Sequence, residues 1–249
     1  MASGSALFRT AISILLLFAM TLPCLAATGG VGTVTHLSGP LFGKKANGLS
    51  RTLSINSAVE QGDTLVTEKR TYGRVKFIDG GEVTLRPGTH FVVESYFFDK
   101  GKPNDDQAVF SLLKGSLRAV TGQVSKRGNM NAYKMKTATA TIGVRGTSFD
   151  LKVCNDDCPG LANGIYFFVV EGKIEVTNSA GTMTFSAGQY GYVKDDATRP
   201  ELLPFAPPDW WEDMPSNRNH ELPHRRFNPF APDFGFDMPP LGIDACGVR

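Results

Sequence analysis

Apolar and polar residues alternate along much of the chain between residues 31 and 193. The clearest case is 74–85, where alternating apolar residues lie on both sides of the run Asp79-Gly80-Gly81. A repeat of two residues is typical of β-strands, because successive side chains point to opposite faces. Asp-Gly between two such runs is a strong signal for a tight hairpin. The pattern therefore predicts a β-hairpin over 74–85.

Similar runs predict a series of short strands with little helical periodicity. They lie at 31–37, within 53–66 (two strands around a Gly62-Asp63 turn), and at 91–96, 110–120, 165–170, 173–177, 182–185 and 190–193. We expect a turn at Glu171-Gly172, after the most apolar run, IYFFVV. The segments LLKGSL (112–117) and VVEGKI (169–174) echo one another weakly. Short strands at this spacing predict an all-β fold, either a sandwich, a barrel or a short β-solenoid.

The run 136–154, KTATATIGVRGTSFDLKVC, contains Gly143-Val144-Arg145-Gly146-Thr147 in the middle of a strand pattern. Two glycines three apart within a strand indicate a bulge, a corner or a close backbone approach. We interpret the run as a structural corner with a buried or half-buried Arg145. Its planar fork could clamp a turn by holding Asp79 or Glu82. No catalytic partner lies nearby in sequence, which disfavours an active-site role.

The first 27 residues have the features of a targeting segment. Arg9 precedes the apolar run 11–22, which is followed by the small residues of 24–27. The run is shorter than the roughly 20 residues that span a bilayer. Charge, apolar core and small residues in this order predict a cleaved signal peptide over 1–27. We therefore expect a periplasmic or secreted protein with no integral membrane span after cleavage.

Cys154, Cys158 and Cys246 follow the predicted signal peptide. In an exported protein, Cys154 and Cys158 would form a disulfide across a short loop. The alternative is half of a metal site, but no second pair of ligands follows in the sequence.

Several motifs, in order, resemble those of the FecR domain, a bacterial envelope module. They are AVEQGDTLVT, VKFIDGGEVTLRPGTHFVV, LLKGSLR, TATIGVRGTSFDL, VVEGKIEV and FSAGQYGYV, spread over about 34–193. The resemblance implies a periplasmic, β-rich, solenoid-like module for interaction or signal transmission, and not an enzyme. It also implies an architectural role for Asp79, Gly80, Gly143, Arg145, Gly146 and Thr147.

The better-known members of this family are transmembrane regulators of sigma factors. They carry a cytoplasmic segment before a membrane helix. Here only residues 1–10 precede the apolar run. We therefore expect a stand-alone exported FecR-domain protein, for which sigma-factor control is in doubt.

The composition changes near Thr198. Ten of the 15 prolines lie between Pro200 and Pro240, together with both tryptophans. Strands do not tolerate this density of proline, so we expect an irregular tail. Its aromatic residues, including Trp210, Trp211, Phe227 and Phe230, could dock on the β domain, bind a partner in the extended proline-rich mode or belong to a disordered segment. The expected organisation is a signal peptide over 1–27, a β domain over 31–194 and a tail over 195–249.

Little in the sequence points to chemistry. The net charge of +2 does not indicate nucleic-acid binding. His220-Glu221-Leu222-Pro223-His224 matches a zinc-protease pattern, but Pro223 would break the helix that this site needs. We predict no catalytic residue, metal or cofactor, and expect a non-enzymatic module that binds an envelope protein or a cell-wall or sugar ligand. The alternative is a solenoid carbohydrate-active enzyme, which would need carboxylates gathered in a groove, or a cell-wall polysaccharide-binding protein.

Overall fold

The computed structural model of the chain describes residues 29–129 and 131–208. The predicted signal peptide lies outside the described residues. So does the part of the predicted tail that contains Trp210, Trp211, Phe227 and Phe230.

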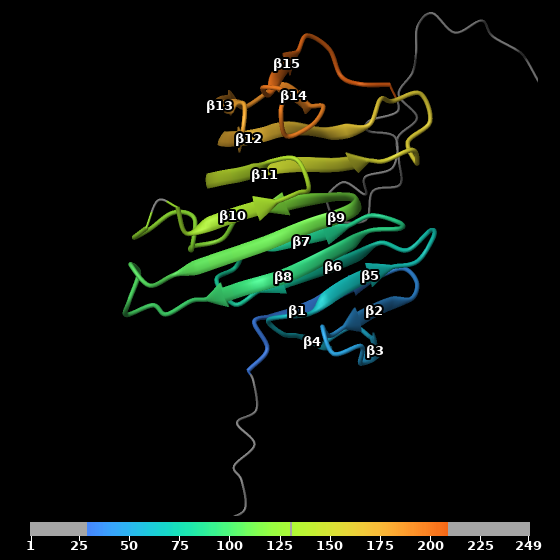
Figure 1. Ribbon diagram of the computed structural model, residues 1–249. Coiled ribbons are helices and arrows are strands. Elements are labelled where there is room, and N and C mark those ends of the chain that lie inside the picture. Colours follow the sequence, from blue (N-terminus) through green and yellow to red (C-terminus); the bar gives the residue numbers. More distant parts are fainter. Residues whose placement is uncertain (1–28, 130, 209–249) are drawn as a thin grey trace, which may run out of the picture. The chain divides into compact units, whose positions relative to one another are not determined.

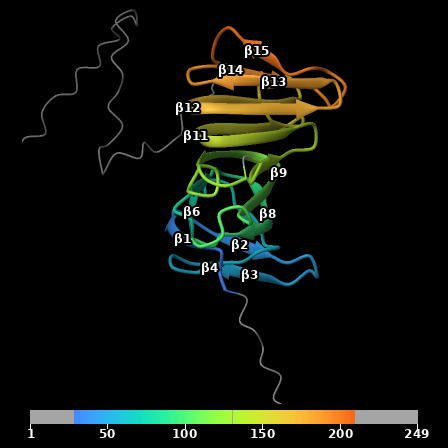
Figure 2. The same ribbon diagram turned by 90° about the vertical axis from the view of Figure 1, so that its left-hand side faces the viewer.

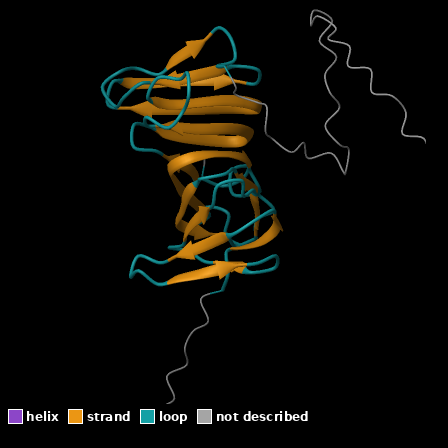
Figure 3. Cartoon of the chain, turned by 90° about the vertical axis from the view of Figure 1, so that its right-hand side faces the viewer, coloured by secondary structure: helices purple, strands orange, loops and turns teal. Residues whose placement is uncertain are grey.

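The described residues form strands and turns and contain no helix (Figure 3), which confirms the predicted all-β class. Accordingly, these residues include no helix able to cross a membrane. The strands are β1 (Gly32–Leu37), β2 (Leu41–Lys44), β3 (Ser50–Leu53), β4 (Ala58–Val59), β5 (Thr64–Thr67), β6 (Gly73–Phe77), β7 (Glu82–Leu85), β8 (His90–Phe97), β9 (Gln107–Val120), β10 (Tyr133–Lys136), β11 (Thr141–Cys154), β12 (Gly164–Asn178), β13 (Gly181–Ser186), β14 (Tyr190–Val193) and β15 (Glu201–Leu203).

Strand pairing arranges the sheet as two layers (Figure 1, Figure 2). Layer 1 has the order β3-β2-β5-β8-β9-β10-β11-β12-β13. Layer 2 has the order β4-β1-β6-β7-β9-β11-β12-β14-β15. Neighbouring strands are antiparallel except for β9 and β10, which are parallel. The architecture is therefore closer to a sandwich than to a regular solenoid.

Three long strands, β9, β11 and β12, belong to both layers. The first part of β9 pairs with β8 and β10 in layer 1, and its last part pairs with β7 and β11 in layer 2. In the interior of each long strand lies one glycine with a positive φ: Gly115 at 82°, Gly146 at 60° and Gly172 at 80°. Glycine adopts this left-handed conformation without the strain that a Cβ would cause. These glycines therefore mark where each strand passes from one layer to the other.

Apolar side chains from both layers form one buried core. Phe77 of β6 and Phe110 of β9 have ring centroids 5.0 Å apart, and Phe167 of β12 and Phe185 of β13 have centroids 4.7 Å apart. Each pair joins a layer 2 strand segment to a layer 1 segment. Burial of such a side chain stabilises a fold by about 1.5–3 kcal/mol, so these contacts hold the layers face to face.

The structure corrects some of the predicted elements. Glu171-Gly172 is not a turn, because β12 continues through it and only changes layer there. β2, β3 and β10, which have four residues each, were not predicted. β15 pairs with β14, so strand pairing continues into the segment predicted as an irregular tail. Pro200 is compatible with this pairing because β15 is an edge strand, where proline is tolerated.

The predicted disulfide between Cys154 and Cys158 is confirmed, with Cα atoms 5.4 Å apart. It begins at Cys154, the last residue of β11. Beside it, Asp157 lies 3.3 Å from Lys114 Nζ, which ties the loop to β9.

Candidate functional site

The predicted hairpin of β6 and β7 closes on a buried carboxylate, that of Asp79. Its Oδ1 accepts a hydrogen bond from the amide of Gly81 at 2.9 Å, and its Oδ2 accepts one from the amide of Val124 at 3.1 Å. The carbonyl oxygen of Asp79 accepts a third, from the amide of Gln123 at 3.1 Å. Asp79 therefore joins its own turn to a segment more than 40 residues later in the chain.

Two glycines make room for this carboxylate. A Cβ on Gly122 would lie 2.4 Å from Asp79 Oδ2, and a Cβ on Gly81 would lie 2.9 Å from the amide nitrogen of Gly122. A Cβ atom does not approach other atoms so closely in proteins. With this backbone conformation, both positions therefore require glycine.

The loop 121–125 (TGQVS) also binds the corner of β11. The amide of Thr147 donates to Thr121 Oγ1 at 2.9 Å, and the amide of Thr121 donates to the carbonyl of Thr147 at 3.0 Å. The amide of Gly146 donates to Ser125 Oγ at 3.3 Å. We call this set of segments, Asp79–Gly81, 121–125 and Gly146–Thr147, the corner junction. It brings together the two strongest sequence motifs, which lie far apart in the chain.

The predicted site residues fall into two groups. Asp79, Gly80, Gly146 and Thr147 lie in the corner junction, and Gly143 lies in β11 opposite Glu175. Thr147 is buried and its hydroxyl donates to the carbonyl of Lys173 at 2.8 Å, which links the kinks of β11 and β12.

The prediction of a buried or half-buried Arg145 is wrong, because Arg145 is exposed. Ile142 and Val144 are buried, and strand alternation places Arg145 on the opposite, outward side. Of its two proposed partners, Asp79 is bound by backbone amides, and Glu82 lies 3.9 Å from Lys76 Nζ. Backbone amides of the loop 121–125 therefore hold the turn, and Arg145 is not the buried residue that was predicted.

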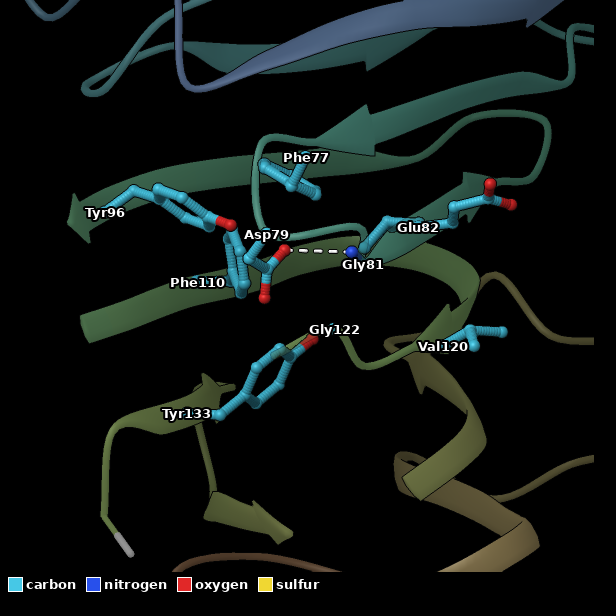
Figure 4. A pocket seen from close by; sticks show the side chains of 10 residues that line it. Phe77, Asp79, Gly81, Glu82, Tyr96, Phe110, Val120, Gly122 and Tyr133 are labelled. Carbon is cyan, nitrogen blue, oxygen red and sulfur yellow. Dashed lines mark hydrogen bonds between the residues drawn. The ribbon is translucent and has the colours of Figure 1, made fainter. Parts of the chain in front are cut away.

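Aromatic rings line the other side of Asp79 (Figure 4). Phe77 stacks on Tyr96 with centroids 5.2 Å apart, and Phe110 packs against Tyr133 at 5.4 Å. Between them lies a cavity of about 10 Å³, with Glu82 and Val120 also in its wall. This is about the room that one water molecule needs.

Burial raises the pKa of the Tyr96 hydroxyl well above its usual value, and the negative charge of Asp79 raises it further. The same two causes, in the same order, raise the pKa of Tyr133. Both hydroxyls therefore remain protonated at any physiological pH.

This arrangement is suited to holding segments together rather than to catalysis. Small-molecule sites typically have about 300–1,000 Å³, far more than the cavity beside Asp79. Among residues 29–129 and 131–208, no group of three or more His, Cys, Asp or Glu side chains could hold a metal ion.

Sequence reasoning missed the loop 121–125, which it treated as part of a polar stretch. Thr121, Val124 and Ser125 are all buried in the structure. The available signal was Val124, an isolated apolar residue two positions after a glycine, but nothing in the sequence connects it to Asp79.

Comparison with protein-family models gives a match in the central part of the chain. Residues 63–175 match the family model described as FecR protein, and this range contains the entire corner junction. Comparison with curated proteins gives no significant match.

Among solved structures, two crystal structures of a candidate anti-sigma factor from Parabacteroides distasonis are similar. They share 19% and 20% sequence identity with this chain, with TM-scores of 0.42 and 0.41. Each alignment covers 56% of this chain and 57% of that chain, so this chain spans little more than half of those proteins. On the strength of the family match, the chain carries a FecR domain over residues 63–175.

Proposed function

We propose that this protein is a non-enzymatic module of the bacterial envelope that acts in signalling or regulation by binding a partner. The observation that carries the proposal is the FecR family match over residues 63–175. The corner junction, which lies within this range, supports the proposal, because its residues hold distant segments of the fold together. The alternative of a carbohydrate-active enzyme has no support from the comparisons.

We further propose that the protein works in the periplasm or outside the cell. Residues 1–27 have the composition of a signal peptide. The Cys154–Cys158 disulfide is typical of an oxidising compartment.

Cell fractionation tests this location. A C-terminally tagged full chain should be found in the periplasm or medium, at a mass reduced by the loss of about 27 residues. Leu16→Arg, which places a charge inside the apolar run, should keep the full-length chain in the cytoplasm. If the wild-type and Leu16→Arg proteins were distributed equally between the cell fractions, export by this segment would be excluded.

The partner is expected to be an envelope protein or a cell-wall or sugar ligand, bound through the aromatic residues Trp210, Trp211, Phe227 and Phe230 of the tail. The motivation is that seven aromatic residues between residues 205 and 236 lie in a proline-rich segment, and extended proline-rich segments are a known mode of recognition.

Affinity capture tests both statements. The full chain is used as bait on native envelopes and, separately, on purified peptidoglycan. Ala at the four tail positions should reduce capture, whereas Phe97→Ala, at an exposed aromatic residue of β8 in the β body, should not. Unchanged capture by the fourfold variant would move the binding site to the β body. No specific capture from either source would contradict the module itself.

A further inference from the structure

The sheet has four edge strands within the described residues: β3 and β13 in layer 1, and β4 and β15 in layer 2. An edge strand exposes main-chain N–H and C=O groups that can pair with another chain, and proteins usually protect such edges by shortness, charge or proline. Three edges have such protection. β4 has two residues, β3 has four and carries Arg51, and β15 has three, begins with Glu201 and follows Pro200.

β13 has none of these three kinds of protection. Its six residues, GTMTFS, contain no charge and no proline, and its register with β12 is unbroken. The loop after β14 binds only the tip of the β12–β13 hairpin, where Asn178 Nδ2 donates to the carbonyls of Asp195 and Thr198. The rest of β13 is left as an open edge among the described residues.

The hydrogen bonds show which groups of β13 face away from β12. The amide of Ser186 donates to the side chain of Gln189 at 2.7 Å, so it is not used by β12. In an antiparallel pair every second residue points its N–H and C=O to the same side. Thr182 and Thr184 therefore direct their main-chain groups outward, and the described residues offer them no partner.

We propose that two copies of this chain pair through β13, antiparallel about a two-fold axis at Met183. Layer 1 then continues from one copy into the other. Thr182 of each copy lies opposite Thr184 of the other, and each such pair exchanges both main-chain hydrogen bonds. Ser186, already satisfied by Gln189, takes no part.

Side chains fit this register as well. Met183 lies on the core side of β13 and is only partly buried. It meets Met183 of the second copy at the axis and loses further contact with water. On the outward face, Glu175 lies opposite Thr184 within one copy. Across the axis, Thr184 lies opposite Thr182 of the other copy, which in turn lies opposite Thr177 of that copy. No like charges therefore lie directly opposite one another.

The pairing goes beyond the proposed function and holds whether or not that function is correct.

Disulfide trapping tests the register. The full chain carries Cys24→Ser and Cys246→Ser, so that Met183→Cys adds the one thiol outside the Cys154–Cys158 bridge. In the proposed register the two Met183 Cα atoms are about 4.5 Å apart, as in a non-hydrogen-bonded pair, and disulfides need about 4.4–6.8 Å. Met183→Cys should give a cross-linked dimer under mild oxidation. Thr177→Cys, one strand inward on the exposed face of β12, should not.

Sedimentation measures the association without a cross-link. The wild-type chain should show a concentration-dependent monomer–dimer equilibrium. Thr182→Lys with Thr184→Lys places like charges opposite one another across the axis and should weaken it by about tenfold or more. Both threonines are exposed, so the monomer should keep its wild-type near-UV circular dichroism. Thr177→Lys is the matched control and should dimerise normally. A wild-type chain that stays monomeric, or a dimer unaffected by the two lysines, would overturn the proposal.

Discussion

Asp79 shows how much one side chain contributes to this fold. Its carboxylate accepts two backbone amides, from Gly81 and from Val124, and it is almost fully buried. A hydrogen bond to a charged acceptor contributes about 1.5–3 kcal/mol, more than a neutral one. The free energy of unfolding should therefore depend strongly on this residue.

Asp79→Asn should lower the free energy of unfolding by about 2–3 kcal/mol, because it removes the charge and directs an NH₂ group at one of the two amides. Urea unfolding at pH 7 measures this loss. Asp105→Asn is the control, since Asp105 is exposed in a loop and should change little. Equal effects of the two substitutions would show that the carboxylate of Asp79 is not a structural tie.

Asp63 predicts how stability depends on pH. Burial alone would raise its pKa, but hydrogen bonds from Arg51, Lys45 and the amide of Glu60 outweigh burial, and the net pKa is lowered. A lowered pKa in the folded state adds stability above the unfolded pKa of about 3.9, and this stability is lost as the pH falls through the folded value. The melting temperature of the wild type should fall as the pH decreases through this acidic range. Asp63→Asn should make the melting temperature depend less on pH there.

The pKa of Asp150 is shifted in the opposite direction to that of Asp63. Burial raises its pKa in spite of Arg118, which donates to both carboxylate oxygens at 2.8 Å and 3.0 Å. Its ionisation therefore costs stability as the pH rises from the unfolded pKa to the folded one. Asp150→Asn should remove this decrease in stability. Asp63→Asn and Asp150→Asn should therefore change the dependence of stability on pH in opposite directions. Parallel changes would contradict both assignments.

At the scale of elements, the distinctive feature is a strand that changes layer at a glycine. Gly115, Gly146 and Gly172 all have a positive φ, and each follows a charged residue in a strand of 14 or 15 residues. The kinks of β11 and β12 touch: a Cβ on Gly172 would lie 2.6 Å from the carbonyl oxygen of Gly146. A side chain at this position would meet both backbone strain and a backbone atom.

Gly172→Ala should therefore lower the free energy of unfolding by at least about 2 kcal/mol, as left-handed backbone alone costs alanine about 1–2 kcal/mol. Gly143→Ala in β11 is the matched control, because a Cβ there would find its nearest neighbour at 3.8 Å and the φ is not positive. Thermal unfolding of both variants makes the comparison. A large loss for Gly143→Ala and none for Gly172→Ala would refute the explanation.

The local elements could be predicted from the sequence, whereas their division between two layers could not. Alternation and Asp79-Gly80 identified the β6–β7 hairpin, and the likeness of LLKGSL to VVEGKI has a structural basis, since both segments contain a layer-changing glycine. Gly172 was nevertheless interpreted as a turn, because glycine promotes turns and strand kinks alike. The loop 121–125 was missed for another reason: its partners, Asp79 and Thr147, are distant in sequence and are selected only by the tertiary fold.

At the scale of the described body, one core extends from β1 to β14 and the three long strands contribute to both layers. Neither layer can unfold without disrupting β9, β11 and β12, which the other layer also needs. We therefore expect residues 29–208 to unfold in a single transition.

Methyl NMR during urea unfolding can test this expectation. Leu41 of β2 and Val193 of β14 are fully buried at distant places in the strand order. Their folded signals should disappear with the same midpoint. Separate midpoints for the two methyl groups would mean that the body contains two independent folding units.

The strands shared between layers also have a mechanical consequence. In a sandwich without shared strands, close-packed side chains alone resist the sliding of one sheet over the other. Here any such shear would also have to bend β9, β11 and β12 at Gly115, Gly146 and Gly172. At Gly115 and Gly172 a neighbouring atom lies 2.6 Å from the position that a Cβ would occupy. A displacement imposed at the β13–β15 end would therefore be carried as rigid-body motion to the β3–β4 end rather than absorbed between the layers.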